Sequence, residues 1–339
     1  MIRRPPRSTQ SRSSAASDVY KRQALNQALL EEMEHDPSVF IIGEDVGRYG
    51  GVLKVSKGIY EKFGAMRAID TPISENGFTS IGVGAALAGL RPVVELMYID
   101  FACLAMDPIV NQAAKARYMF GGKAKVPIVF RTQGGGGRGN AAQHSQSLEA
   151  WFAHVPGLIV IQPATPKDAK GLLKAAIRND NPVVFIEHKL LYNTKGPLPE
   201  EEYVIPIGKA DIKRAGSDLT IIASSYMVLQ SLAAAEKLAV EGIQAEVLDL
   251  RTLKPLDMET IAASVTKTRR LLVVNEGART CGYAAEVVTR VYEELFDELD
   301  APIRRLTAED VPIPYNGALE EQALPNENSI FQAALSFFR

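Results

Sequence analysis

Residues 67–78 read Arg67-Ala68-Ile69-Asp70-Thr71-Pro72-Ile73-Ser74-Glu75-Asn76-Gly77-Phe78. The apolar residues before Thr71 predict a strand, and Pro72 ends it because the residue before a proline is restricted to extended geometry. A helix is predicted to begin after Ser74, a residue type that caps helix N-termini well. The predicted apolar side of this helix consists of Phe78, Ile81, Ala85, Leu87 and Ala88.

Glu75 lies at the carboxyl end of this strand and in the first turn of this helix. In open α/β sheets, ligands bind in the crevice at the carboxyl ends of the strands. A carboxylate in the first turn of a helix also complements the helix dipole without any ligand. Taken alone, the stretch favours this second, structural role for Glu75.

Length and composition set the class of protein. The chain has 339 residues, which suggests two domains of ordinary size, and it is 46% hydrophobic and 23% charged, as globular proteins are. The most apolar run, residues 78–90, is too short to span a bilayer. A net charge of −2 favours neither nucleic acid nor an anionic membrane as a partner. Cys103 and Cys281 are far apart and are interpreted as free thiols in a reducing compartment.

Continuous apolar strands alternate with amphipathic helices along the chain. Besides the strand before Thr71, the predicted strands are 39–42, 92–97, 127–131, 158–161, 183–186, 219–223, 245–250, 271–274 and 303–306. This alternation predicts an α/β protein with two domains, each a mostly parallel sheet flanked by helices. We expect residues 24–195 to form the first domain and residues 205–339 the second. Residues 196–204, with proline and an acidic run, are expected to be the linker.

Residues 1–23 differ in composition from the rest of the chain. They are rich in Arg and Ser and carry no acidic residue before Asp18, which is typical of an organellar transit peptide. The run from Ile2 to Gln23 also resembles translated sequencing-adapter read-through joined to a truncated gene. We favour this second interpretation because the helical pattern begins abruptly after Gln23. The segment is expected to be disordered and without function, and a bacterial cytoplasmic location follows unless the leader is genuine.

The sequence resembles one known family. From about Ala24 to the C-terminus it is similar to beta subunits of the first, thiamine-diphosphate-dependent component of 2-oxo acid dehydrogenase complexes, of the pyruvate dehydrogenase and acetoin dehydrogenase type. The segments that carry the resemblance are 43–46, 70–78, 88–92, 142–146, 168–172, 249–253 and 299–302. The resemblance implies a transketolase-like pyrimidine-binding domain followed by a transketolase C-terminal domain.

The resemblance also implies a site for thiamine diphosphate. Glu75 corresponds to the acid that exchanges a proton with the aminopyrimidine ring, a task that requires a carboxyl group with a tuned pKa in a largely apolar pocket. His144 corresponds to a histidine at the thiazolium end that stabilises the intermediate or relays protons. Met97 and Phe101 match positions that pack around the cofactor, although a plain core role explains both equally well.

A cation site is expected at the end of the helix that precedes Asn181. The last carbonyl groups of a helix lack partners, and that end is the negative pole. The resemblance implies a structural potassium ion there, held mainly by backbone carbonyls of Ile128, Ala176, Ile177, Asn179 and Asn181. The alternative is an ordinary helix end whose carbonyl groups are hydrated.

The chain contains no Gly-Asp-Gly, the motif with which thiamine enzymes usually anchor the diphosphate and magnesium. One chain therefore holds half a site, and the resemblance implies an alpha subunit that supplies the other half in an α2β2 heterotetramer. The expected activity is that of pyruvate dehydrogenase (acetyl-transferring), which decarboxylates pyruvate, a small 2-oxo acid, and acetylates the lipoyl group of the acyltransferase core. Met97 and Phe101 favour pyruvate over branched-chain substrates, whereas residues 111–125 and 187–195 resemble acetoin dehydrogenase, so these alternatives stay open.

Two further alternatives belong to other classes. Residues 134–139 read Gly-Gly-Gly-Gly-Arg-Gly and fit the dinucleotide fingerprint of a Rossmann oxidoreductase. That fingerprint requires a helix at the last glycines and an acidic residue at the end of the next strand, whereas the strand 158–161 ends in Gln162. The other alternative is a non-catalytic assembly subunit, which the presence of both Glu75 and His144 disfavours.

Overall fold

The strands predicted in the first half of the chain form one sheet in the computed structural model, which describes residues 17–339. Its members are β2 (Val39–Gly43), β3 (Ala68–Asp70), β4 (Arg91–Leu96), β5 (Val129–Gly134), β6 (Ile159–Ile161), β7 (Val183–His188) and β12 (Thr252–Lys254). Their order across the sheet is β12-β6-β7-β5-β4-β2-β3. Every pair is parallel except β12–β6, as continuous apolar strands predict.

Helices cover both faces of this sheet. On one face lie α1 (Lys21–His35) and α6 (Pro166–Arg178), whose apolar residues pack against β2, β5 and β7. On the other lie α3 (Glu75–Leu87), α5 (Glu149–His154) and the irregular helical segment 99–119. Thr165 caps the start of α6, since its hydroxyl oxygen accepts the backbone N–H of Asp168 at 3.2 Å.

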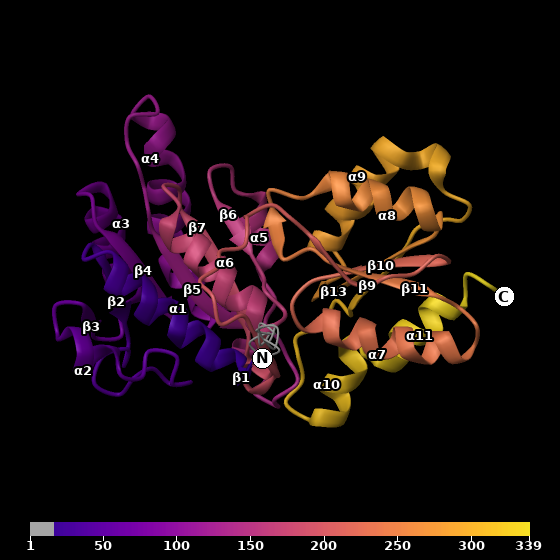
Figure 1. The fold of residues 1–339 in the computed structure, drawn as a ribbon, viewed down its shortest axis with the longest axis horizontal. Coiled ribbons are helices and arrows are strands. Elements are labelled where there is room, and N and C mark those ends of the chain that lie inside the picture. Colours follow the sequence, from indigo (N-terminus) through magenta and orange to yellow (C-terminus); the bar gives the residue numbers. More distant parts are fainter. Residues whose placement is uncertain (1–16) are drawn as a thin grey trace, which may run out of the picture.

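The second half of the chain forms a five-stranded sheet beside the first (Figure 1). Its strands are β9 (Asp211–Arg214), β10 (Leu219–Ala223), β11 (Ala245–Asp249), β13 (Leu271–Ala278) and β14 (Arg304–Ala308), in the order β14-β13-β10-β11-β9. Only β9 is antiparallel to its neighbour. The helices are α7 (Tyr226–Val240), α8 (Met258–Thr268), α9 (Tyr283–Leu295), α10 (Gly317–Ala323) and α11 (Glu327–Leu335). In Figure 1, α8 and α9 cover one face of the sheet and α7 and α11 the other.

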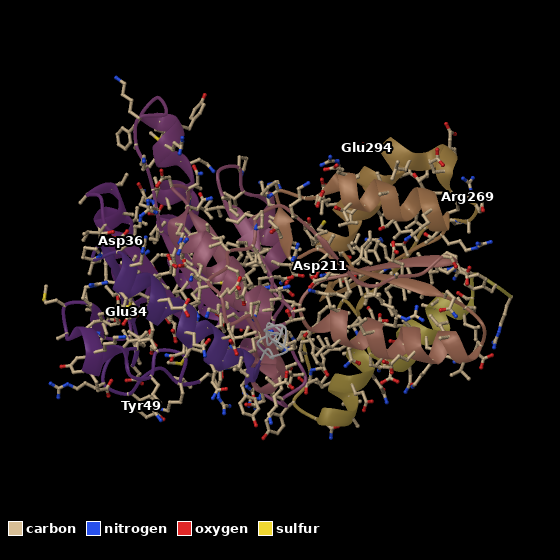
Figure 2. The ribbon with its side chains drawn as sticks, in the orientation of Figure 1. Glu34, Asp36, Tyr49, Asp211, Arg269 and Glu294 are labelled. Carbon is tan, nitrogen blue, oxygen red and sulfur yellow. The ribbon has the colours of Figure 1, made fainter. Side chains whose placement is uncertain are left out.

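The two domains are joined by buried contacts as well as by the chain. Strand β12 belongs to the second half of the sequence but completes the first sheet. Asp211, near the junction of the domains in Figure 2, accepts a hydrogen bond from Lys213 at 2.6 Å. Lys213 also binds Asp168 of α6 at 2.6 Å, and Arg251 lies 3.3 Å from the same carboxylate. These ion pairs fix the second domain against the first.

The expected disordered leader is wrong for residues 17–23. Strand β1 (Ser17–Tyr20) pairs antiparallel with β8 (Lys195–Leu198), and α1 begins at Lys21. Strand β8 also takes up the first residues of the expected linker. The composition of the leader could not reveal this pairing, because its partner is far away in the sequence. Residues 1–16 lie outside the described part of the chain, and the non-native origin of the leader stays a prediction.

Residues 99–119 do not form one regular helix. A 3₁₀ helix (Ile99–Ala105) leads into a π-helical segment (Asp107–Ala113) and then into α4 (Ala114–Met119). Pro108 lies at the start of the π segment. Because proline has no backbone N–H, a regular helix through this position would lose one hydrogen bond. Within residues 17–339, no helix is long and apolar enough to cross a membrane.

The predicted apolar side of α3 is only partly correct. Phe78 is buried, but Ile81 and Leu87 are 60% and 43% exposed. The buried side consists of Glu75, Phe78, Thr79, Gly82, Val83 and Ala86. Gly82 explains the difference, because a Cβ at this position would lie 2.5 Å from Val94 of β4. The sheet approaches the helix at its smallest residue and leaves larger apolar residues outside.

This close approach predicts opposite effects for two glycines of the same helix. Gly82→Ala should destabilise the chain by about 1–3 kcal/mol, because the added methyl group has no space against Val94. Gly84→Ala should stabilise it by about 0.5–1 kcal/mol, because a Cβ there meets no atom within 4 Å and alanine favours the helix. Urea unfolding of the isolated chain measures both, and equal effects would contradict the packing of α3 on β4.

Candidate active site

Glu75 lies where the sequence predicts, in the first turn of α3. Ser74 is the N-cap residue, although its side chain makes no capping hydrogen bond. Glu75 is 6% exposed, whereas Ser74 and Asn76 on either side are exposed. Glu75 is therefore buried beyond the carboxyl end of β3. An interaction with the helix dipole alone would not require this burial.

A second carboxyl group, that of Glu44, lies close to Glu75. Asp70 holds the loop after Glu44 in place, since its carboxylate accepts the N–H groups of Gly47 at 2.6 Å and of Arg48 at 3.2 Å. Burial raises the pKa of Glu44, and the negative charge of Glu75 raises that pKa further. One oxygen of Glu44 is buried without a hydrogen-bond partner in the described chain. Two adjacent carboxyl groups in such a setting favour retention of a proton.

His144 lies in a cluster of aromatic rings. It ends a short 3₁₀ turn (Ala142–His144), and its ring centroid lies 5.1 Å from that of Tyr98 and 5.3 Å from that of Phe101, both edge to face. The buried Lys189 donates hydrogen bonds to the His144 carbonyl oxygen and, at 3.4 Å, to the hydroxyl of Ser145. Burial lowers the pKa of Lys189, although nearby acidic groups oppose that shift. The imidazole is thus held by packing on its ring and by an ammonium group on its backbone.

The structure brings the four predicted catalytic and cofactor residues into one region. Helix α3, which begins with Glu75, packs against the 3₁₀ helix that contains Phe101, and this helix contacts the turn that ends in His144. Met97 follows β4 directly, and its carbonyl oxygen accepts a hydrogen bond from Gln133 at 2.9 Å. All four residues follow the carboxyl ends of parallel strands of one sheet, namely β3, β4 and β5, as the fold class predicts.

The five residues predicted to hold potassium lie at the other end of the strands, where β5 and β7 begin. Ile128 precedes β5, and Ala176 lies in the last turn of α6. There Arg91 donates hydrogen bonds to the carbonyl oxygens of Ile177, at 3.0 Å, and Asn179, at 3.1 Å. A guanidinium group therefore already supplies positive charge to these two carbonyls. These contacts do not test the potassium site, which stays a prediction.

A buried charge network, which the sequence analysis missed, supports the strand ends of the site. Arg131 of β5 is 3% exposed and donates hydrogen bonds to both oxygens of Glu187, at 2.6 and 2.9 Å, and to Glu95. Tyr192 donates its hydroxyl to Glu187 as well. Burial raises the pKa of Glu95 even though Arg131 opposes the shift. The sequence signal that could have revealed this network is the single charged residue near the end of each of three apolar strands, namely Glu95, Arg131 and Glu187.

A second buried pair joins the domains near His144. The ring of His188 at the end of β7 lies 2.8 Å from Glu276 of β13 and stacks on Tyr226 with ring centroids 4.9 Å apart. Burial raises the pKa of Glu276, but His188 and the N–H of Gly136 outweigh this effect and leave the pKa below its ordinary value. Glu276 is thus a buried carboxylate that contacts the first domain.

The glycine-rich stretch 134–139 does not have the geometry of a dinucleotide site. The N–H of Gly136 donates to Glu276 at 2.6 Å, and those of Gly137 and Gly139 donate to Glu320 at 2.7 and 2.9 Å. The amides that a pyrophosphate would require are therefore bound to carboxylates, and no α-helix begins at the last glycines. Among the described residues, no group of three or more His, Cys, Asp or Glu is arranged to hold a metal ion.

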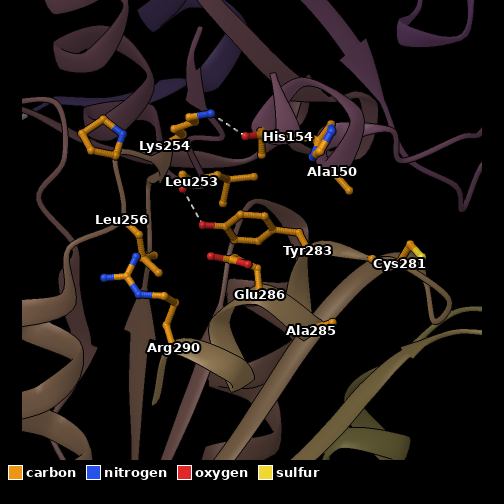
Figure 3. Close-up of a pocket in the computed structure, with 13 residues that line it drawn as sticks. Ala150, His154, Leu253, Lys254, Leu256, Cys281, Tyr283, Ala285, Glu286 and Arg290 are labelled. Atoms are coloured by element: carbon orange, nitrogen blue, oxygen red, sulfur yellow. Dashed lines mark hydrogen bonds between the residues drawn. The ribbon is translucent and has the colours of Figure 1, made fainter. Parts of the chain in front are cut away.

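Two cavities lie between the domains. One, of about 650 Å³, opens beside His144 and is lined by its neighbours Gln143 and Ser145 together with Glu276 and Asp310. Another, of about 700 Å³, lies among α5, β12 and the start of α9 (Figure 3). In the second cavity Tyr283 donates a hydrogen bond to the Leu253 carbonyl oxygen. The first cavity adjoins the candidate site because residues on both sides of His144 line it, whereas the second cavity has no such residue in its lining.

Comparisons with known proteins agree with this architecture. The family profile "Transketolase, pyrimidine binding domain" matches residues 18–195, and "Transketolase, C-terminal domain" matches residues 208–330. The chain is 52% identical over 331 residues to "Pyruvate dehydrogenase E1 component subunit beta-1, mitochondrial" of Arabidopsis thaliana, with 96% of this chain and 91% of that protein covered. The chain belongs to the pyruvate dehydrogenase E1 beta subunit family.

Further relatives support membership of this family. "Pyruvate dehydrogenase E1 component subunit beta" of Chaetosphaeridium globosum is 50% identical over 317 residues, which cover 94% of this chain and 97% of that protein. A solved structure, "Split gene transketolase, inactive beta4 tetramer", shares the fold with a TM-score of 0.76 at 22% identity, over 94% of this chain and 97% of that chain. The predicted family and the α/β fold class are confirmed, and membership of this family implies the use of thiamine diphosphate and an alpha subunit.

The buried network beneath the site yields a stability prediction. Arg131→Met should lower the free energy of unfolding by about 3–5 kcal/mol, because it leaves Glu95 and Glu187 buried without their cation. Arg138→Met, in the exposed part of the glycine-rich stretch, is the matched control and should change it by less than about 0.5 kcal/mol. Urea unfolding of the isolated chain measures both, and a loss below about 1 kcal/mol for Arg131→Met would contradict the assigned network.

Proposed function

We propose that the chain is the beta subunit of a pyruvate dehydrogenase (acetyl-transferring). With an alpha subunit it decarboxylates pyruvate on thiamine diphosphate and reductively acetylates the lipoyl group of the acyltransferase core. The observation that carries this proposal is the buried Glu75 at the carboxyl end of β3, in one region with His144, Met97 and Phe101. The identity of about one half to proteins named for this activity supports it.

The residues present fit the cofactor. When bound, thiamine diphosphate supplies the chemistry that stabilises the carbanion left by decarboxylation. Glu75 offers a buried carboxyl group that can hold or release a proton, and Met97 and Phe101 offer apolar surface. The described residues lack a cluster of metal-binding side chains, so we propose that the alpha subunit anchors the diphosphate and its magnesium ion.

The proton chemistry falls to two side chains. Glu75 is the proposed group that exchanges a proton with the cofactor, and its carboxyl group is buried near that of Glu44. The His144 imidazole, held edge to face against Tyr98 and Phe101, is the proposed donor and acceptor on the substrate side.

The outer surface of α3 supports the proposed alpha partner. Ile81 is 60% exposed, and Leu87 and Leu90 beside it are 43% and 42% exposed. The same surface carries the exposed small residues Gly84 and Ala88, which allow another helix to approach closely. We propose that an alpha subunit covers this surface in an α2β2 heterotetramer and so completes the site beside Glu75.

Some finer features rest on the sequence alone. Acetoin and branched-chain 2-oxo acids stay as alternative substrates, and acetoin is favoured by residues 111–125 and 187–195. A structural potassium ion at the end of α6 stays a proposal, and two of its proposed carbonyls, those of Ile177 and Asn179, also accept hydrogen bonds from Arg91. We keep a bacterial cytoplasmic location as the proposal, with an organellar one as the alternative because the Arabidopsis relative is named mitochondrial.

The proposed role of Glu75 predicts a large loss of activity in one variant. Glu75→Gln, co-expressed with the alpha subunit, should acylate a lipoyl domain from pyruvate at least about 100-fold more slowly than wild type, because the amide cannot exchange the proton. Assembly of the tetramer, followed by gel filtration, should be unchanged. Glu293→Gln, the same change at an exposed position of α9, is the control and should retain full activity.

Three other outcomes would change the proposal. Full activity of Glu75→Gln in an assembled tetramer would contradict a catalytic role and favour an assembly subunit. A wild-type complex that prefers acetoin or a branched-chain 2-oxo acid would keep the mechanism and replace the substrate. NADH binding by the chain alone would favour the Rossmann alternative.

A further inference from the structure

The stretch that leads to His144 is held by the second domain. Glu320, in the middle of α10, is 3% exposed, and its two oxygens accept the N–H groups of Gly137 at 2.7 Å and of Gly139 at 2.9 Å. Glu276 accepts the N–H of Gly136 at 2.6 Å. Hydrogen bonds from amides to carboxylates are stronger than those between neutral groups, so these contacts constrain the backbone of the glycine-rich stretch.

The conformation of the stretch is specific to this contact. Gly137 and Gly139 have φ angles of +86° and +64°, which residues with a side chain rarely adopt. A Cβ on Gly136 would lie 2.4 Å from Leu324, and one on Gly137 would lie 2.7 Å from Leu190. The second domain therefore sets the direction of the amides, whereas Leu324 of the second domain and Leu190 of the first together limit the space available to the backbone.

The position of Glu320 is fixed by its own helix. Asn316 caps α10, since its side-chain oxygen accepts the N–H groups of Ala318 at 3.0 Å and of Leu319 at 3.3 Å. Glu320 forms the next turn of this helix and faces inward, whereas Glu321 beside it is exposed. Two glutamates in sequence thus provide a buried carboxylate and a matched exposed one.

The constraint extends to His144 along a short segment. Only residues 140–143 separate Gly139 from His144, and Ala141 in that segment has a φ of +61°. On the far side, Lys189 holds the carbonyl of His144 and the hydroxyl of Ser145. The segment is thus fixed at both ends, by Glu320 before His144 and by Lys189 after it.

We propose that Glu320 is a positioning residue for His144, acting through the N–H groups of Gly137 and Gly139. The proposal rests on the proposed function, in which His144 contacts the reacting groups. It gives the second domain a role in catalysis, since the position of a side chain from the first domain depends on a carboxylate of the second. A tight and correctly placed histidine is required because a small displacement of a catalytic group costs a large part of the rate.

The test compares Glu320→Gln with Glu321→Gln. A glutamine at 320 has the same shape, but its NH₂ group faces one of the two backbone N–H groups and leaves it without an acceptor. In the complex with the alpha subunit, Glu320→Gln should lower kcat by about tenfold and change KM for pyruvate by less than about twofold, since substrate contacts are unchanged. Glu321→Gln should match wild type in both constants.

A double-variant cycle with His144→Ala separates positioning from general stability. If Glu320 acts through His144, the variant with both substitutions should have the same kcat as His144→Ala alone. If Glu320→Gln lowers kcat by the same factor with and without His144, the effect does not pass through His144 and the proposal is overturned. A kcat for Glu320→Gln equal to that of Glu321→Gln would also overturn it.

Trypsin gives a readout that does not depend on activity. Arg138 is exposed between Gly137 and Gly139, so cleavage after it reports on the mobility of the stretch. In the isolated chain, Glu320→Gln should be cleaved there at least about fivefold faster than wild type and Glu321→Gln, since local opening governs cleavage. Equal cleavage rates would remove the anchoring step from the proposal. A wild-type complex without dehydrogenase activity would contradict the proposed function instead, while the cleavage rates would still decide the anchoring.

Discussion

The hydrogen bonds from the glycine-rich stretch to Glu276 and Glu320 connect the candidate site to the second domain. Strand β12 of the same domain pairs with β6 and completes the first sheet, and Lys213 binds Asp168 at the junction. Separation of the two domains would break these hydrogen bonds and ion pairs as well as the pairing of β12 with β6. The catalytic region is therefore a property of the pair of domains and not of the first domain alone.

Charge is distributed in a consistent way around that region. Below it, Arg131 balances Glu95 and Glu187 inside the sheet, so the strand ends are rigid. At its surface, Glu75 and Glu44 stand close together without such a cation, and burial raises the pKa of Glu44. The charges of Arg131, Glu95 and Glu187 neutralise one another in part, whereas Glu44 and Glu75 are two neighbouring acids. Neighbouring buried acids of this kind are common at sites of proton transfer. The exposed apolar residues of α3 lie on the surface that the proposed alpha subunit would cover.

Local patterns allowed much of the fold to be predicted. The apolar strands and the place of Glu75 in the first turn of α3 depend on residues close in sequence, and the structure confirms both. The pairing of β12 with β6 could not be predicted, because neither strand carries a signal for the other. The outer position of Ile81 was missed for a similar reason, since it depends on the distance between Gly82 and Val94.

The same limit applies to the site. His144, Met97 and Phe101 followed from a resemblance, and the structure places them near one another. Lys189, Glu276 and Glu320 were not found, because each acts on the glycine-rich stretch or on His144 from a distant part of the chain. The contact of Arg91 with Ile177 and Asn179 also lies outside any local pattern. The contacts that position a histidine in a polar loop therefore cannot be predicted from the local sequence, because they come from distant parts of the chain.

Binding of thiamine diphosphate, measured by titration calorimetry with magnesium present, tests the half-site directly. The isolated chain, the isolated alpha subunit and the reconstituted complex would each be titrated. A site divided between two chains predicts strong binding in the complex and at least about 100-fold weaker binding to either chain alone, since each lacks half of the contacts. Binding to the isolated beta chain as tight as to the complex would show a complete site in one chain and would contradict this account.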